Sequence, residues 1–178
     1  MSITNELVAH HATLRQLYAQ SEIDPKVFDE FTRHLVVHHT MEEKYFYDIL
    51  KSIPEAEHDA LEAVNEHHII EMIIKDAEGF PPEHEHFPIK IEGLGEYTTH
   101  HLDEEELEIF PMSLQVMSAE DLDTLGKLFA KPKINYWGLN CLMFPVRSPR
   151  RPPGLPHVPK RLRAAPARPP LRASVLEV

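Results

Sequence analysis

The chain contains a single cysteine, Cys141, and no long run of apolar residues. One cysteine excludes an internal disulfide and any zinc or iron–sulfur site built from several cysteines, as is usual in a reducing cytosol. No segment is long and apolar enough to span a bilayer. The N-terminus also lacks the basic start and the apolar run of a signal peptide, so we expect a protein of the cytoplasm.

Positive charge is scarce over residues 1–130, where 8 Lys or Arg stand against 28 Asp or Glu, a net charge of −20. An acidic surface argues against binding to nucleic acid or to an anionic membrane. From residue 131 to the end the balance reverses, with 10 Lys or Arg against 1 acidic residue, a net charge of +9. We therefore expect one domain over residues 1–131 and a separate extension over residues 132–178.

The extension is rich in proline and arginine, with nine prolines between residues 145 and 172. Such a composition can neither continue a helix nor bury a core, so we expect this segment to be disordered. The apolar stretch at residues 136–144 is too short to span a membrane. Whether the basic tail has a function of its own stays open at this stage.

Residues 1–130 lack the alternating pattern of β-strands, and their apolar residues recur at helical spacing. Proline and glycine divide them into helices over about residues 4–20, with Thr4 as the N-cap, and about 25–53, 55–78 and 89–116. A short fifth helix is expected from Ser118, its N-cap, to about Ala130. Long helices with short connections predict an all-α fold, an antiparallel four-helix bundle with up-down-up-down topology.

Four pairs of adjacent histidines punctuate these helices, one pair on each of the four long ones: His10-His11, His38-His39, His67-His68 and His100-His101. In two pairs a glutamate follows four residues later, giving H-x-x-x-E at His38 and Glu42 and again at His101 and Glu105. Residues four apart lie on one helical face, so each motif directs an imidazole and a carboxylate the same way.

The spacing of apolar residues indicates which histidine of each pair points inward. On the second helix Leu35 and Phe46 share a face with His38 and Glu42, which leaves His39 about 100° away. On the fourth helix the face of Leu94 and Tyr97 continues through His101 and Glu105.

The third helix directs His67 inward, with Ile70 and Ile74. On the first helix both His10 and His11 fit the apolar face. Four inward histidines and two inward glutamates would bury polar groups that need partners, and a metal centre satisfies all of them together.

These residues resemble the hemerythrin-like HHE domains, whose pattern is H…HxxxE…H…HxxxE on a four-helix bundle. The resemblance covers about residues 1–130 and extends to the flanking segments HHTMEEKYFY and HLDEEELEIFP. It implies two non-haem irons, with Glu42 and Glu105 as bridges. It further implies that the terminal ligands are His11, His38, His67 and His101.

The sequence differs from those of the oxygen-carrying hemerythrins at one position. Those proteins have a further histidine one turn before the third-helix ligand, where this chain has Ala63, so we expect a more open site. Tyr97 and Glu66 are candidates for extra ligands, although a core tyrosine and a solvated glutamate are the simpler interpretations. The remaining histidines His10, His39, His68 and His100 are expected at the surface or behind the ligands.

Three functions remain open on this evidence. The first is a di-iron protein that binds O2, NO or iron for sensing, storage or buffering, without turnover. The second is an enzyme that acts on peroxide or NO, or donates iron for the repair of iron–sulfur clusters. The third is a zinc or structural metal site, because imidazole and carboxylate also suit zinc and manganese.

Overall fold

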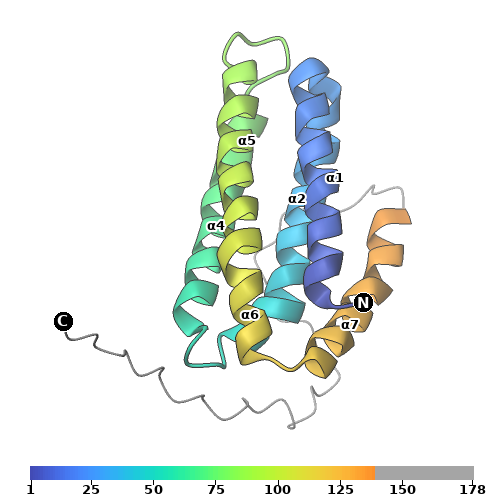
Figure 1. The fold of residues 1–178 in the computed structure, drawn as a ribbon. Helices are drawn as coiled ribbons and strands as arrows, with labels where there is room; N and C mark the ends of the chain where they lie inside the picture. Colours follow the sequence, from blue (N-terminus) through green and yellow to red (C-terminus); the bar gives the residue numbers. More distant parts are fainter. Residues whose placement is uncertain (139–178) are drawn as a thin grey trace, which may run out of the picture.

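The structure is a computed structural model that describes residues 1–138, including the side chains of residues 1–130. Every regular element in this part of the chain is helical, which confirms the all-α class (Figure 1). The α-helices are α1 (Ile3–Ile23), α2 (Phe28–Glu42), α3 (Asp48–Leu50), α4 (Glu57–Glu78), α5 (Phe87–Glu104), α6 (Phe110–Val116) and α7 (Ala119–Gly138). The other elements are the 3-10 turn η1 (Pro25–Val27) and the π-helical turns η2 (Glu43–Tyr47) and η3 (Glu105–Ile109).

The helices α1, α2, α4 and α5 lie side by side and form the body of the molecule (Figure 1). Helix α1 packs against α2 and α5, and α4 packs against the same two helices. Helix α7 packs along the outer side of α1. The N-terminal ammonium group fixes this contact, since it lies 2.6 Å from Oδ1 of Asp123.

Most of the predicted helix ends are confirmed, with corrections at three places. Helix α1 starts after Ser2, whose hydroxyl accepts the backbone N–H of Asn5 at 3.4 Å, so Thr4 is not its N-cap. The predicted cap of α7 is confirmed, because Ser118 Oγ accepts the backbone N–H of Asp121 at 3.1 Å. Helix α7 runs beyond Ala130 to Gly138, so the extension expected from residue 132 begins as helix. The rest of that extension lies outside the described residues.

The third correction is that the second and fourth predicted helices are not continuous α-helices. A π-helical turn interrupts each of them at the end of the H-x-x-x-E motif: η2 begins directly after Glu42, and η3 begins at Glu105 itself. Pro111, which has no backbone N–H, follows η3 as the second residue of α6. Single π turns inside α-helices are frequent at functional sites. Here they change which side chains face inward after each motif.

Two apolar clusters fill the interior, and we call them cluster A and cluster B. The residues of cluster A include Ile3, Leu7, Met41, Phe46, Leu50, Ala60, Ala63, Ile109 and Phe129. The residues of cluster B include Leu14, Leu17, Phe28, Phe31, Leu35, Ile70, Ile74, Ile91 and Leu94. Along α1, α2 and α4 the buried histidines fall between the residues of the two clusters. The polar residues therefore form a layer enclosed by apolar side chains at both ends.

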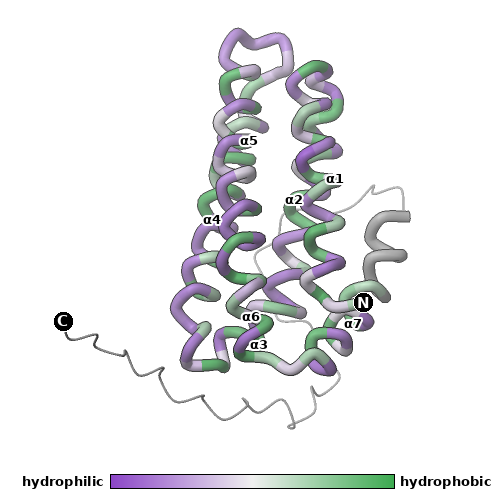
Figure 2. The backbone as a smooth tube through the Cα atoms, viewed as in Figure 1, coloured by the Kyte–Doolittle hydropathy of each residue, from purple (hydrophilic) through white to green (hydrophobic). Residues whose placement is uncertain are grey.

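Hydrophilic and hydrophobic residues alternate along the helices of this body, as expected for helices that bury one face (Figure 2). Among the described residues, no helix is long and apolar enough to cross a membrane.

Candidate metal centre

Six buried side chains meet in the polar layer, and they are the six that the sequence singled out. They come from α1, α2, α4, α5 and η3 and are at most 1% exposed: His11, His38, Glu42, His67, His101 and Glu105. The two carboxylates lie at the centre of the group. Glu42 Oε2 is 3.3 Å from His38 Nε2 and 3.6 Å from His67 Nε2. The H-x-x-x-E motif on α2 therefore meets the histidine of α4.

Glu105 connects the other pair of helices in the same way. Its Oε2 lies 3.2 Å from His11 Nε2, and its Oε1 lies 3.5 Å from His101 Nε2. His11 Nε2 is also 3.8 Å from Glu42 Oε1. Both His10 and His11 are buried, and His11 is the one of the two that approaches both carboxylates.

The six residues form two overlapping groups, each with one donor atom per residue and all donor atoms within 4.8 Å of one another. One group comprises His11, His38, Glu42 and Glu105, and the other comprises Glu42, His67, His101 and Glu105. Both groups contain both carboxylates. Two cations placed in these groups would share Glu42 and Glu105 and would each have two imidazoles of their own.

Several polar atoms of these residues have no hydrogen-bond partner in the described part of the chain. They are His11 Nε2, His38 Nε2, both carboxylate oxygens of Glu42 and Glu105 Oε2. Buried polar atoms without partners are rare because each one costs free energy. Their lone pairs converge on one place, so the residues fit a metal centre on donor chemistry as well as on distance.

Burial and the charges of neighbouring side chains shift the pKa values of the groups in the centre. Burial lowers the pKa of His11, but the carboxylates of Glu105 and Glu42 outweigh burial and raise it to about 10. Burial and the charge of Glu105 raise the pKa of Glu42. Burial alone would raise the pKa of Glu105, yet His101 and His11 lower it. Without a cation, the centre therefore keeps protons that a bound metal would displace.

Three of the four histidines are held from behind by a carboxylate. The nitrogen Nδ1 of His11 lies 2.8 Å from Glu106, that of His67 lies 3.0 Å from Glu43, and that of His101 lies 2.7 Å from Glu66. Each of these glutamates adjoins a residue of the centre in the sequence. A carboxylate on the outer nitrogen fixes the tautomer of an imidazole and leaves Nε2 available to a metal.

The fourth histidine, His38, is held by another histidine. Its Nδ1 lies 2.9 Å from Nδ1 of His10, and the two rings meet edge to face. His10 is thus buried behind His38, which agrees with the expectation that the outer histidines lie either at the surface or behind the ligands. Glu66, a candidate extra ligand, likewise lies behind a histidine. Its carboxylate contacts Nδ1 of His101, the ring nitrogen opposite the one that faces Glu105.

Tyr47 is a member of the site that the sequence analysis missed. It is completely buried, and its phenol donates a short hydrogen bond to Glu105 Oε1. Tyr47 follows Glu42 by five residues, which in a regular α-helix would place it well off the face of Glu42. The π turn η2 brings it inward. The corresponding residue after Glu105 is Phe110, which stacks on His11.

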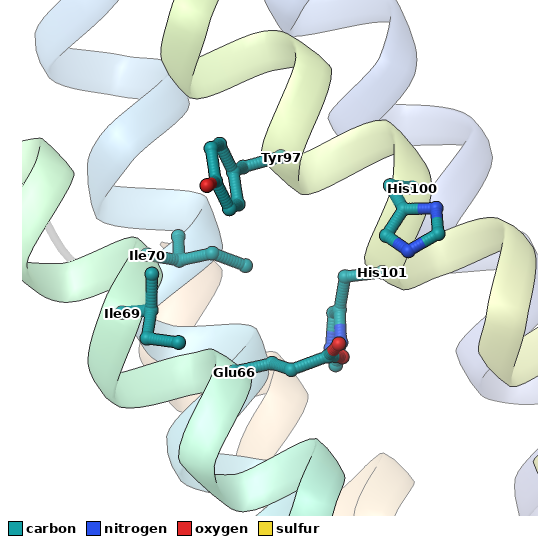
Figure 3. A pocket seen from close by; sticks show the side chains of 6 residues that line it. All are labelled: Glu66, Ile69, Ile70, Tyr97, His100 and His101. Atoms are coloured by element: carbon teal, nitrogen blue, oxygen red, sulfur yellow. The ribbon is translucent and has the colours of Figure 1, made fainter.

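Tyr97 was expected on the inner face of its helix, and that expectation is wrong. Its side chain is 56% exposed, and Thr98 takes the inner position instead. Tyr97 lines a pocket of about 210 Å³ with Glu66, Ile69, Ile70, His100 and His101. Figure 3 shows the Glu66 carboxylate against the His101 ring at one side of this pocket. The pocket therefore approaches the centre from outside, between α4 and α5.

His39 was expected at the surface or behind the ligands, and it is buried, at 1% exposure. Its ring stacks on that of His67 with 3.9 Å between the ring centroids. A residue 100° from the inner face of α2 still faces a neighbouring helix, because α4 covers that side. His68 and His100 are exposed, as expected.

A protein-family model described as the hemerythrin HHE cation binding domain matches residues 2–113. The match extends from the start of α1 into α6 and includes all six residues of the centre. The comparison with curated proteins found no match, and neither did the comparison with solved structures.

Proposed function

The chain belongs to the hemerythrin HHE cation-binding family, and we propose that it is a non-haem di-iron protein that binds a small diatomic ligand, O2 or NO. The observation that carries this proposal is the pair of four-residue groups that share Glu42 and Glu105. In this proposal both carboxylates hold both ions. His11 and His38 complete one ion's protein ligands, and His67 and His101 complete those of the other.

The donor set supports iron on chemical grounds. Imidazole and carboxylate together bind Fe, Mn and Zn. Two imidazoles and two carboxylates for each ion would leave coordination positions on that ion unfilled. Two irons, when bound, supply a redox-active centre that can accept a diatomic molecule at such a position. The protein that we propose is a binder for sensing, storage or buffering, built on the up-down-up-down antiparallel bundle typical of the family.

The surrounding residues have defined tasks in this function. Glu43, Glu66 and Glu106 orient three histidines through their outer nitrogens. Tyr47 fixes Glu105 by donating to one of its oxygens. Apolar clusters A and B exclude bulk water from both ends of the polar layer. We infer that a small uncharged ligand approaches through the pocket beside Glu66 and Tyr97, which lies at His101.

Exposure of the reduced, iron-loaded protein to stoichiometric O2 or NO tests this proposal. A binder gives an absorption change that saturates at a fixed ratio per chain and reverses when the gas is removed. Continuous consumption of NO or of added peroxide would instead identify an enzyme. No spectral change with either gas on a protein that holds two irons would contradict ligand binding and favour iron storage or donation.

A zinc or structural site is the second outcome to separate. Its signature is a protein purified without added metal that contains zinc and does not exchange it for Fe(II) under anaerobic conditions. That result would overturn the di-iron proposal while leaving the family assignment in place.

A further inference from the structure

Two buried polar side chains beside the centre have no hydrogen-bond partner among the described residues. They are His39 on α2, 1% exposed, whose two ring nitrogens are both unpaired, and Thr98 on α5, 3% exposed, whose hydroxyl oxygen is unpaired. A neutral imidazole carries one donor and one acceptor nitrogen, and a hydroxyl group is both donor and acceptor. Burying such groups without partners costs free energy, so each of them calls for an explanation.

Both residues lie at the same level of the bundle, between the centre and cluster B. On α2, His39 follows Leu35 of cluster B by four residues and precedes the glutamate of the H-x-x-x-E motif by three. On α5, Thr98 follows Leu94 of cluster B by four residues and precedes His101 by three. Residues three or four apart lie one above the other on a helix, so each side chain occupies the turn that separates the centre from the apolar cluster.

The ring of His39 lies against the two histidines of one half of the centre. It is parallel to the ring of His67, at 6° and with 3.9 Å between the centroids, and it meets the ring of His101 edge to face, at 83° and 5.7 Å. One nitrogen of His39 lies within 4.8 Å of a nitrogen of each of these two histidines. Because a stacked ring lies one layer away from His67, its nitrogens are directed into a plane beside the one in which His67 would hold a cation. His39 therefore faces the space next to that cation and not the cation itself.

This space adjoins the pocket between α4 and α5. Ile70 and His101 both line that pocket (Figure 3). Ile70 belongs to cluster B and follows His67 by three residues, so it occupies on α4 the turn that His39 and Thr98 occupy on α2 and α5. The pocket thus reaches the level of the bundle at which the two unpaired side chains lie.

We propose that His39 and Thr98 recognise the small ligand of the centre by hydrogen bonds, at a position beside His67 and His101. This inference rests on the proposed function, because it names the residues that select its ligand. A diatomic molecule that takes up negative charge when iron binds it offers an acceptor atom, to which the N–H of His39 and the hydroxyl of Thr98 can donate. The position therefore favours ligands with an acceptor atom over apolar molecules of the same size.

Replacing His39 by phenylalanine tests the inference, because phenylalanine keeps a ring that can stack on His67 and removes both nitrogens. The matched control is His68→Phe, which changes an exposed histidine on α4. Thr98→Val removes only the hydroxyl group and keeps the shape of the side chain, so it remains informative if His39→Phe does not fold. All variants are loaded anaerobically with Fe(II), their iron content is measured, and NO is then titrated into them.

We expect iron content and Fe(II) affinity to be unchanged in the three variants, since none of the replaced residues holds the metal. NO should bind about fivefold more weakly to His39→Phe and to Thr98→Val, the equivalent of one hydrogen bond in each, and with unchanged affinity to His68→Phe. The infrared stretching vibration of bound NO should also move to higher frequency in the first two variants, because a hydrogen bond from the protein weakens the N–O bond.

An unchanged NO affinity with an unchanged vibration in His39→Phe, on a protein that holds its iron, would overturn the inference. If His39→Phe does not fold, the same result in Thr98→Val overturns it. Loss of iron from His39→Phe would overturn it too, because His39 would then support the metal and not the ligand. A wild type that holds two irons and shows no response to NO contradicts the proposed function itself, so the two failures are distinguishable.

Discussion

Tyr47 donates its phenol hydrogen to the carboxylate of Glu105, a residue 58 positions further along the chain. The contact joins the two π-helical turns, since Tyr47 ends η2 and Glu105 begins η3. Both partners are fully buried. The hydrogen bond thus fixes the carboxylate of Glu105 through a residue that lies just after Glu42, the other carboxylate of the centre.

Tyr47→Phe removes this hydrogen bond and keeps the ring. We expect metal affinity to fall by about 10-fold or more, in the range measured when an outer partner of a metal ligand is lost. Chelator competition on the iron-loaded proteins measures it. Tyr45→Phe is the control, because Tyr45 belongs to the same turn and makes no contact with Glu105 among those described; equal affinity in the two variants would show that Tyr47 only fills space.

Glu66→Gln removes the charge behind His101 while keeping a side chain of the same length. Since Glu66 lies 2.7 Å from His101 Nδ1, we expect the metal affinity to decrease about 10- to 100-fold. Glu62→Gln, one turn earlier on α4 and exposed, should have no effect. Fe(II) titration of both variants checks this, and loss of affinity in Glu62→Gln as well would point to a general effect of surface charge.

Metal affinity should rise with pH. The carboxylates of the centre raise the pKa of His11 to about 10, after burial is overcome, and burial with the charge of Glu105 raises the pKa of Glu42. Both groups therefore hold protons near pH 7 that a cation must displace, and at higher pH fewer protons compete. Calorimetry in buffers of different ionisation enthalpy counts the protons released. Affinity that is constant between pH 6 and pH 9 would contradict this account.

Gly95→Ala should destabilise the fold. A Cβ atom at Gly95 would lie 2.0 Å from two ring carbons of Tyr18, so the Tyr18 ring, or the helix α1 that carries it, would have to shift. We expect a loss of about 1–3 kcal/mol in the free energy of unfolding, as for other overpacked sites. Gly93→Ala is the control on the same helix, because a Cβ there would meet nothing within 4 Å. Urea denaturation of the metal-free variants measures both, and equal stabilities would refute the packing argument.

The inward residues of the H-x-x-x-E motifs could be predicted because helical spacing and apolar neighbours agree. Leu35, His38 and Glu42 repeat at three and four residues, and all three are buried. The same rule failed for Tyr97. The residues three and four positions after Leu94, Tyr97 and Thr98, could both lie on the inner face, and the smaller Thr98 is the buried one. Spacing alone does not choose between positions 97 and 98.

Tyr47 and His39 could not be found by periodicity for two different reasons. The π turn after Glu42 shifts the register by one residue, so a wheel with regular α-helical steps places Tyr47 wrongly. His39 lies 100° from the inner face, yet a helix of this body has neighbours on two sides and buries a wider sector than its central stripe. One signal for Tyr47 was present in the sequence. The segments that follow the two H-x-x-x-E motifs both have an aromatic residue five positions after the glutamate, Tyr47 after Glu42 and Phe110 after Glu105.

The number of irons per chain tests the central claim most directly. Elemental analysis would be made on the wild type after anaerobic loading with Fe(II) and removal of excess metal, beside Glu42→Ala and Glu105→Ala. We predict two irons in the wild type, and loss of most bound iron with a lower melting temperature in both variants, because each glutamate would serve both positions of the proposed centre. One iron or none in the wild type, or full occupancy in either variant, would contradict a centre built on two shared carboxylates.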